Sequence, residues 1–225
     1  MTTKPAAPVR QRRKEARPQE LLDAALELFV EKGFAATRSE EVAARAGVAK
    51  GTLYLYYPSK EDLLKAVVRE NLSTLIAEGA AIAGEFSGST QELLVLLIQT
   101  WWERVGNTPA SGIFKIILTE MGNFPDFGRF YTAEVIEPTQ ALFGRVLERG
   151  IATGELRPVN TFEAVHVLLF PMLMMCLHKH SLGACAGMRE MLEPSSFIRT
   201  HVDVVVRGLQ KRPEQESARP AGAPS

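Results

Sequence analysis

Apolar residues recur at the spacing of an α-helix along most of the chain. In the first such stretch they follow one another at intervals of three and four residues, at Leu22, Ala25, Leu26 and Phe29. This is the period of one face of a helix. Pro18 suits the first turn of that helix and Gly33 suits its end. We therefore predict a helix between these two residues.

Two short helices and a longer one are expected next. The run Thr37-Arg38-Ser39-Glu40 has the form of a capping box, which predicts a short helix continuing to Ala46. Gly47 interrupts the pattern, and a second short helix is predicted over 50–57, before Pro58. Ser59 is a favourable N-cap for the longer helix that follows.

Beyond residue 85 the predicted helices become longer and more apolar. We expect them at about 89–105, 110–121, 126–152, 160–180 and 194–210, separated by breaks rich in Gly and Pro. The valine run at 202–206 favours a strand locally, but its setting favours a helix. The fold class predicted for the chain is all-α.

The stretch 37–60 has the form of a helix-turn-helix. Two short helices are joined at Gly47, a residue type that adopts a positive φ without a Cβ clash. Leu53 and Tyr57 are placed to anchor the second helix. Its outward residues are then Lys50, Gly51, Thr52, Tyr54 and Tyr56. Such a surface suits a DNA groove, although spacing alone leaves open a merely structural helical hairpin.

The charge is unevenly distributed. The formal net charge of the chain is zero, yet residues 1–70 hold 13 Lys and Arg against 10 Asp and Glu. Residues 1–17 hold 6 Lys and Arg against one Glu, and we expect this basic segment to be a flexible arm. A basic arm can bind phosphate, and a solvated tail explains the same composition equally well. The Pro-rich and Ala-rich segment 211–225 is expected to be a disordered tail.

The composition also bears on location and chemistry. The first residues lack the apolar stretch of a secretory signal, and no uninterrupted apolar run of membrane-spanning length is evident. Only Cys176 and Cys185 are present, which fits a reducing cytoplasm. No phosphate-binding loop, dinucleotide fingerprint, nucleophile elbow or paired cysteine motif occurs. We expect neither an enzyme nor a bound cofactor.

The segment 16–68 contains a series of spaced short motifs: AALELF at 24–29, KGF at 32–34, Thr37, VA at 42–43, AGV at 46–48, KGTLY at 50–54, Tyr57 and SKEDL at 59–63. With these motifs the segment resembles the DNA-binding domain of the TetR family of transcriptional regulators. Two positions depart from the family pattern. Ala49 stands where a capping Ser or Thr is usual, and Tyr56-Tyr57 replaces a His-Phe pair.

The resemblance implies roles for particular residues. Thr37 and Arg38 are expected to contact phosphate at the start of the second helix, and Tyr56 and Lys60 to contact phosphates beside the groove. Entry into the major groove is implied for Lys50, Gly51, Thr52 and Tyr54. The family also implies a homodimer, a roughly palindromic operator and a small-molecule effector. The domains expected are then 18–68 for DNA binding and 69–210 for effector binding and dimerisation.

Within 69–210 the similarity is weak, and composition supplies the candidate residues. The predicted lining of a hydrophobic or aromatic effector pocket is Trp101, Trp102, Phe114, Leu118, Phe130, Met172, Met175 and Cys176, with His178 as a polar anchor. Two adjacent tryptophans cannot both face one core, so one is expected at a cavity or interface. The predicted dimer seam is Phe162, Val165, Leu169, Leu173 and Leu177, against Phe197, His201, Val204 and Val205. Many of these side chains would equally serve as ordinary core.

Two other readings remain open at this point. Cys176, His178, His180 and Cys185 suggest a metal site or a redox sensor, but the two-residue spacing places His178 away from the face of its neighbours, and we predict no metal. A helical protein–protein adaptor is the alternative to a DNA-binding regulator. It would account for the apolar helices but not for the exposed Lys50, Tyr54 and Tyr56.

Overall fold

The computed structural model describes residues 9–180 and 193–210, with side chains from residue 17 onward. No β-strand occurs in these ranges, which confirms the all-α fold class. The helices are α1 Val9–Lys32, α2 Ser39–Arg45, α3 Lys50–Tyr56, α4 Lys60–Val68, α5 Thr74–Glu85, α6 Thr90–Trp101, α7 Ile113–Glu120, α8 Pro125–Tyr131, α9 Glu137–Ala152, α10 Thr161–His180 and α11 Pro194–Leu209. Shorter segments join some of them: η1 Arg69–Ser73, η2 Trp102–Gly106, η3 Pro109–Gly112 and η4 Thr132–Ile136.

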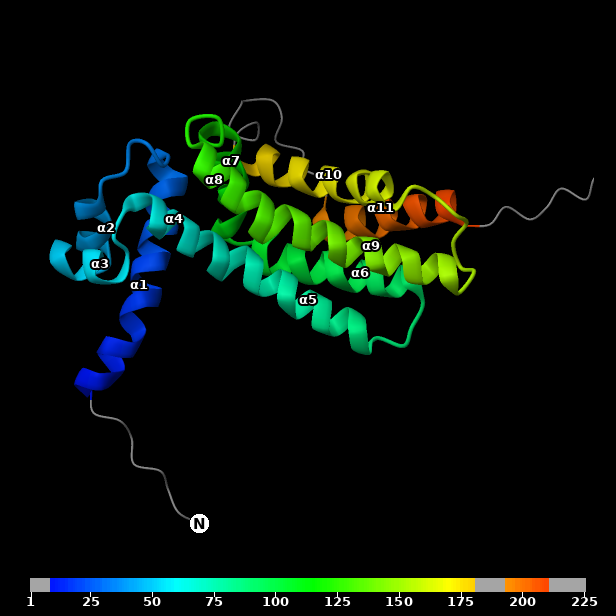
Figure 1. Ribbon diagram of the computed structural model, residues 1–225, viewed down its shortest axis with the longest axis horizontal. Helices are drawn as coiled ribbons and strands as arrows, with labels where there is room; N and C mark the ends of the chain where they lie inside the picture. Colours follow the sequence, from blue (N-terminus) through cyan, green and yellow to red (C-terminus); the bar gives the residue numbers. More distant parts are fainter. Residues whose placement is uncertain (1–8, 181–192, 211–225) are drawn as a thin grey trace, which may run out of the picture.

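The first four helices form a small head at one end of the molecule (Figure 1). α1 packs against α2 and α4, and α2 packs against α3. Phe29 and Phe34 meet edge to face in its core, with ring centroids 5.3 Å apart. The turn between α2 and α3 is made at Gly47, whose φ of +65° is open to glycine and strained for other residues. The helix-turn-helix that was predicted from the sequence is therefore present.

A long rod leaves the head and becomes part of the larger helical bundle. α4, the π-helical segment η1 and α5 follow one another without a break from Lys60 to Glu85, and Figure 1 shows them crossing from the head along the bundle. α8, η4 and α9 form a second such rod. The two rods contact each other through η1 and η4 and through α5 and α9.

α10 and α11 form the side of the bundle farthest from α5. They contact each other and pack on α9 and α6 respectively. An 18-residue window of α10 reaches a mean hydropathy of 1.5, so length and composition alone would allow this helix to cross a membrane. No such helix was expected from the sequence. One third of that window is buried within the protein, so α10 combines a packed face with an exposed apolar one.

Two local expectations are corrected by the structure. α1 begins at Val9 rather than at Pro18, so the second half of the predicted flexible arm is helical. The cap of α2 is also shifted by one residue. Arg38 occupies the N-cap, and its main-chain N–H donates to Glu41 Oε2 at 3.1 Å. Thr37 and Glu40, predicted to make the capping box, are therefore not its partners. The predicted tail at 211–225 and Cys185 lie outside the described residues.

Candidate DNA interface and ligand cavity

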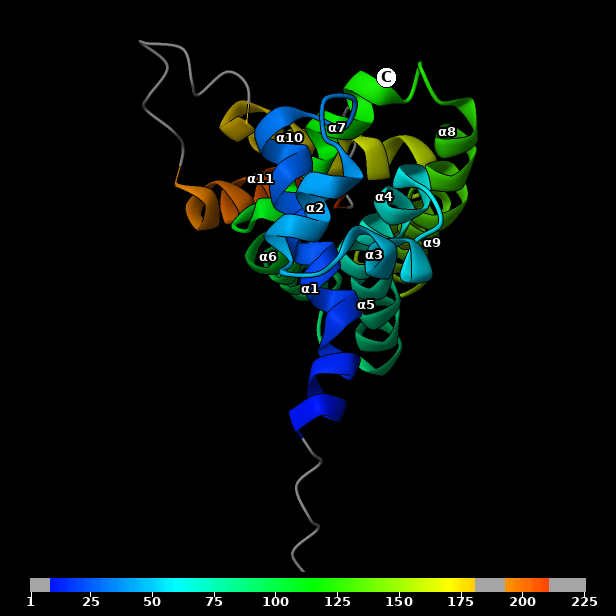
Figure 2. The same ribbon diagram turned by 90° about the vertical axis from the view of Figure 1, so that its left-hand side faces the viewer.

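The outer surface of α3 is the candidate reading surface for DNA. Leu53 is fully buried and anchors the helix. Lys50, Gly51 and Tyr54 are exposed, while Thr52 and Tyr56 are half-buried. Figure 2 turns the head toward the viewer, with α3 at its surface. The α3 N-cap is Ala49, whose side chain makes no capping hydrogen bond, as expected for alanine.

A charged and aromatic cluster organises this surface. Lys50 forms an ion pair with Glu40 of α2, and its ammonium lies 5.8 Å from the centroid of the Tyr54 ring. The pairing with Lys50 lowers the pKa of the Glu40 carboxyl. Leu55, which is not among the contacts predicted from the sequence, is 84% exposed. Its exposure could have been predicted from the sequence, because Leu55 lies between Tyr54 and Tyr56 and away from the helix face that holds Leu53.

Two residues predicted to contact phosphate have other partners. Thr37 is 1% exposed, and its hydroxyl donates to the carbonyls of Gly33 at 2.8 Å and Leu28 at 3.2 Å. Its side chain thus closes the end of α1 and is removed from the set of DNA contacts. Lys60 Nζ donates to three carbonyls of the α1–α2 loop, those of residues 34, 35 and 37, at 2.8, 3.2 and 3.1 Å.

These contacts change the interpretation of Lys60. An ammonium has three N–H donors, and all three have partners in the protein. The same ammonium lies 4.5 Å from the centroid of the Phe34 ring. Lys60 therefore stabilises the loop before α2 and does not extend toward phosphate. Arg38 is exposed beside this loop and stays a predicted phosphate contact.

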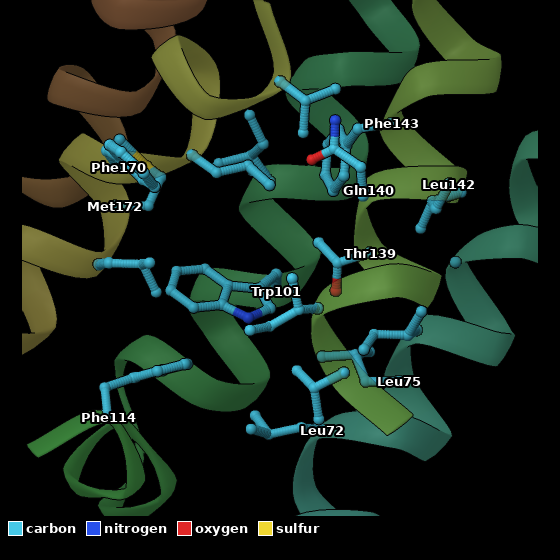
Figure 3. Close-up of a pocket in the computed structure, with 18 of the residues that line it drawn as sticks. Leu72, Leu75, Trp101, Phe114, Thr139, Gln140, Leu142, Phe143, Phe170 and Met172 are labelled. Atoms are coloured by element: carbon cyan, nitrogen blue, oxygen red, sulfur yellow. The ribbon is translucent and has the colours of Figure 1, made fainter. Parts of the chain in front are cut away.

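A cavity of about 470 Å³ lies inside the larger bundle, within the range of small-molecule sites. Its lining is mostly aliphatic and aromatic and comes from both rods, α6, α7 and α10. Figure 3 shows Trp101, Phe114, Leu72, Leu75, Thr139, Gln140 and Phe143 around this space. The polar side chains on the wall are Thr100, Tyr131, Thr139, Gln140 and His166.

The structure divides the predicted pocket residues into two groups. Trp101, Phe114, Leu118 and Met172 line the cavity. The other five do not and are corrected: Trp102, Phe130, Met175, Cys176 and His178. Trp102 is 3% exposed in the core, and Phe130 packs under Arg69, whose guanidinium carbon lies 4.7 Å from the ring centroid. Met175 and Cys176 are buried on another face of α10.

The predicted dimer seam on α10 is corrected in the same way. Four of its members, Val165, Leu169, Leu173 and Leu177, line the cavity. Phe162 is exposed at the start of the helix. Val167 and Met174 are exposed elsewhere on α10, and Val204 is exposed on α11. Phe170 is also exposed, but it lines the cavity as well. Phe197, His201 and Val205 of α11 are half-buried, and His201 Nε2 donates to the Leu168 carbonyl at 2.9 Å.

The histidine and cysteine residues form no metal-binding group among the described residues. His180 Nε2 lies 2.7 Å from the Ser111 hydroxyl, and burial is the main cause that lowers the pKa of its imidazole. Burial raises the pKa of the Cys176 thiol to about 12. Since the thiolate is the reactive form and the side chain is fully buried, the structure gives no support for Cys176 as a redox sensor.

A helix-turn-helix head joined by a continuous rod to a helical bundle with an apolar cavity defines a one-component DNA-binding regulator. Comparison with known proteins agrees. Residues 21–67 match the model described as "Bacterial regulatory proteins, tetR family". Residues 86–184 match "Tetracyclin repressor-like, C-terminal domain". The chain belongs to the TetR family and is a DNA-binding transcriptional regulator.

Individual relatives support the assignment. The chain is 30% identical to the transcriptional repressor KstR2 of Rhodococcus jostii over 145 residues, 64% of this chain and 70% of that one. It is 27% identical to the fatty acid metabolism regulator protein of Bacillus subtilis over 146 residues, 64% and 74% of the two chains. The fold is similar to that of FadR from Bacillus subtilis in complex with stearoyl-CoA, with a TM-score of 0.68, 20% identity, and coverage of 85% and 99%.

Proposed function

We propose that this protein is a homodimeric cytoplasmic repressor that leaves a roughly palindromic operator when a small apolar molecule fills its cavity. One observation carries the proposal. The unbroken rod from Lys60 to Glu85 has its first turn in the head, while Leu72, Leu75 and Ile76 farther along it line the cavity. A ligand that displaces the cavity wall therefore acts on the same element that holds the reading head.

Hydrogen bonds between η1 and η4 join the two rods beside the cavity. Arg69 donates to Glu134 Oε1 from Nε at 3.2 Å and from a terminal nitrogen at 2.9 Å. The Ser73 hydroxyl donates to the Glu134 carbonyl at 3.2 Å. Both contacts join η1 to η4, and each of these segments also contributes to the cavity lining. Ligand binding shifts the equilibrium toward the released form only as far as its affinities for the two forms differ.

Dimerisation is proposed through the exposed apolar faces of α10 and α11. Val167, Phe170 and Met174 are each more than half exposed, as is Val204 on the neighbouring helix. Contiguous apolar surface on a soluble protein marks an interaction site. A twofold pairing of these helices presents two heads to two half-sites, which is why the operator is expected to be palindromic.

The groove contacts proposed for each head are Lys50, Gly51, Thr52 and Tyr54, with Leu55 as an apolar neighbour. Arg38 and Tyr56 are the proposed phosphate contacts. Lys50 must exchange its ion pair with Glu40 for one with phosphate, which is feasible because both side chains are about half exposed. Apolar contact with a thymine methyl group suits Leu55.

The names of related proteins support an apolar effector. The solved structures with the same fold include a stearoyl-CoA complex of FadR and a ketosteroid regulator of Mycobacterium tuberculosis. These names concern those proteins, but both are consistent with the largely hydrocarbon lining of the cavity found here.

The proposal is tested by selecting duplexes bound by the full chain from a random DNA library at fixed, near-physiological salt. Enrichment of a palindrome is expected, and the selected site then serves to screen apolar compounds for release. Enrichment of a single asymmetric half-site by a monomer would refute the dimeric mechanism. A variant with Val167→Glu and Met174→Glu is the matched control, since it should lose the palindrome while its heads stay intact.

A further inference from the structure

Two of the five polar side chains that line the cavity, Gln140 and His166, form hydrogen bonds to one main-chain carbonyl. The Gln140 amide nitrogen on α9 donates to the Phe162 carbonyl at 3.3 Å. His166 Nδ1 on α10 lies 2.7 Å from the same oxygen. Because a carbonyl oxygen can only accept, both nitrogens are donors in these hydrogen bonds. One oxygen thus orients two side chains that line the cavity.

This arrangement determines which polar atoms are left for a ligand. With its nitrogen turned to the carbonyl, the Gln140 amide has its oxygen free, and Figure 3 shows that oxygen on the cavity side. In the tautomer with its hydrogen on Nδ1, His166 has an acceptor at Nε2. The imidazole is further fixed between two phenylalanines, with its centroid 4.5 Å from that of Phe162 and 5.0 Å from that of Phe170. Both free atoms are acceptors.

The remaining residues of the cavity lining indicate whether a bound ligand can carry a charge. No lysine or arginine is among the described residues that line the cavity. A carboxylate or phosphate beside Gln140 and His166 would give up part of its hydration at this exposed part of the wall, and no cationic side chain of the described lining would offset that loss. The acceptor pair would in addition repel an anion. Tyr131, a buried phenol on the same wall, is also uncharged, because burial raises its pKa.

We infer that the effector is an uncharged apolar molecule with a hydrogen-bond donor, such as a hydroxyl group, whose hydrogen is accepted by Gln140 Oε1 or His166 Nε2. This rests on the proposed effector-responsive function and specifies its ligand. The structure thereby favours an alcohol over a fatty acid anion or a coenzyme A thioester, although all three carry the same hydrocarbon chain.

The test compares four probes with one chain length: 1-decanol, 1-methoxydecane, decanoate and decanoyl-coenzyme A. Binding to the full chain is measured by calorimetry and by tryptophan emission at about pH 8. The alcohol is expected to bind about tenfold more tightly than the methyl ether, the gain of roughly one well-made hydrogen bond. The variants Gln140→Leu and His166→Phe should together abolish most of that preference.

The ether serves as the internal control, because it fills the cavity without donating. Unchanged ether affinity in both variants shows that the cavity is intact and that the lost preference belongs to the acceptor pair. Tighter binding of decanoate or the thioester, a preference that survives both substitutions, or no binding by any probe would overturn the inference. A probe that binds as expected but leaves the operator complex intact would instead refute the proposed function. Release by an anionic probe alone would retain the function and overturn the ligand class.

Discussion

Lys60 offers a sharp test of the structural reasoning, because sequence resemblance and structure give it opposite roles. The substitution Lys60→Met keeps the apolar stem over Phe34 and removes the ammonium. Three main-chain carbonyls of the α1–α2 loop then lose their donor. Hydrogen bonds to charged groups contribute about 1.5–3 kcal/mol each, but these three share one half-buried ammonium and the carbonyls regain water.

We expect the substitution to lower the free energy of unfolding by about 2–3 kcal/mol, a net value near that of one charged hydrogen bond. For a chain of this size the midpoint of thermal unfolding then falls by roughly 4–12 °C. The salt dependence of DNA binding should stay as in the parent protein, because the ammonium makes no phosphate contact. Differential scanning calorimetry and DNA titrations at several salt concentrations measure the two quantities.

Lys50→Met is the matched control within the same head. Lys50 is exposed, and its contacts among the described residues are an exposed ion pair with Glu40 and the Tyr54 ring, so its loss should leave the unfolding midpoint nearly unchanged. The slope of log affinity against log salt should fall by about 0.9, the contribution of one phosphate contact. The reasoning is refuted if Lys60→Met lowers the salt slope in this way while thermal stability is retained.

Other substitutions test separate features. Gly47→Ala should cost about 1 kcal/mol in thermal unfolding from its positive φ alone, since a Cβ there meets nothing within 4 Å; an unchanged midpoint would contradict the turn geometry. Thr37→Val should destabilise the head by about 1–2 kcal/mol without altering the salt slope, and a lowered slope would restore Thr37 as a phosphate contact. Met174→Glu should convert dimer to monomer in sedimentation velocity, whereas a persistent dimer would place the interface elsewhere. In a Cys185→Ser background, Cys176 should resist alkylation of the native protein at neutral pH, because burial raises the pKa of its thiol to about 12; rapid alkylation would show that the thiol is accessible.

The sequence alone determined the helical class and the reading head, since both depend on local patterns. Apolar spacing predicted the helices, and the Gly47 turn with Leu53 on the inner face of α3 predicted the helix-turn-helix. Such patterns extend over only one or two turns of a helix, so they can be recognised without the tertiary structure.

Only the tertiary structure shows which face of each later helix packs against which neighbouring helix. α10 is apolar almost all round, so its sequence could not separate the cavity face with Leu169 from the outward face with Met174. The sequence likewise predicted that one of two adjacent tryptophans faces a cavity or interface, and packing selected Trp101. Lys60 gave no local sign of its role, because its carbonyl partners lie 23–26 residues away in the chain. Contacts at that separation depend on how α4 packs against the α1–α2 loop, and periodicity within a single helix carries no information about that packing.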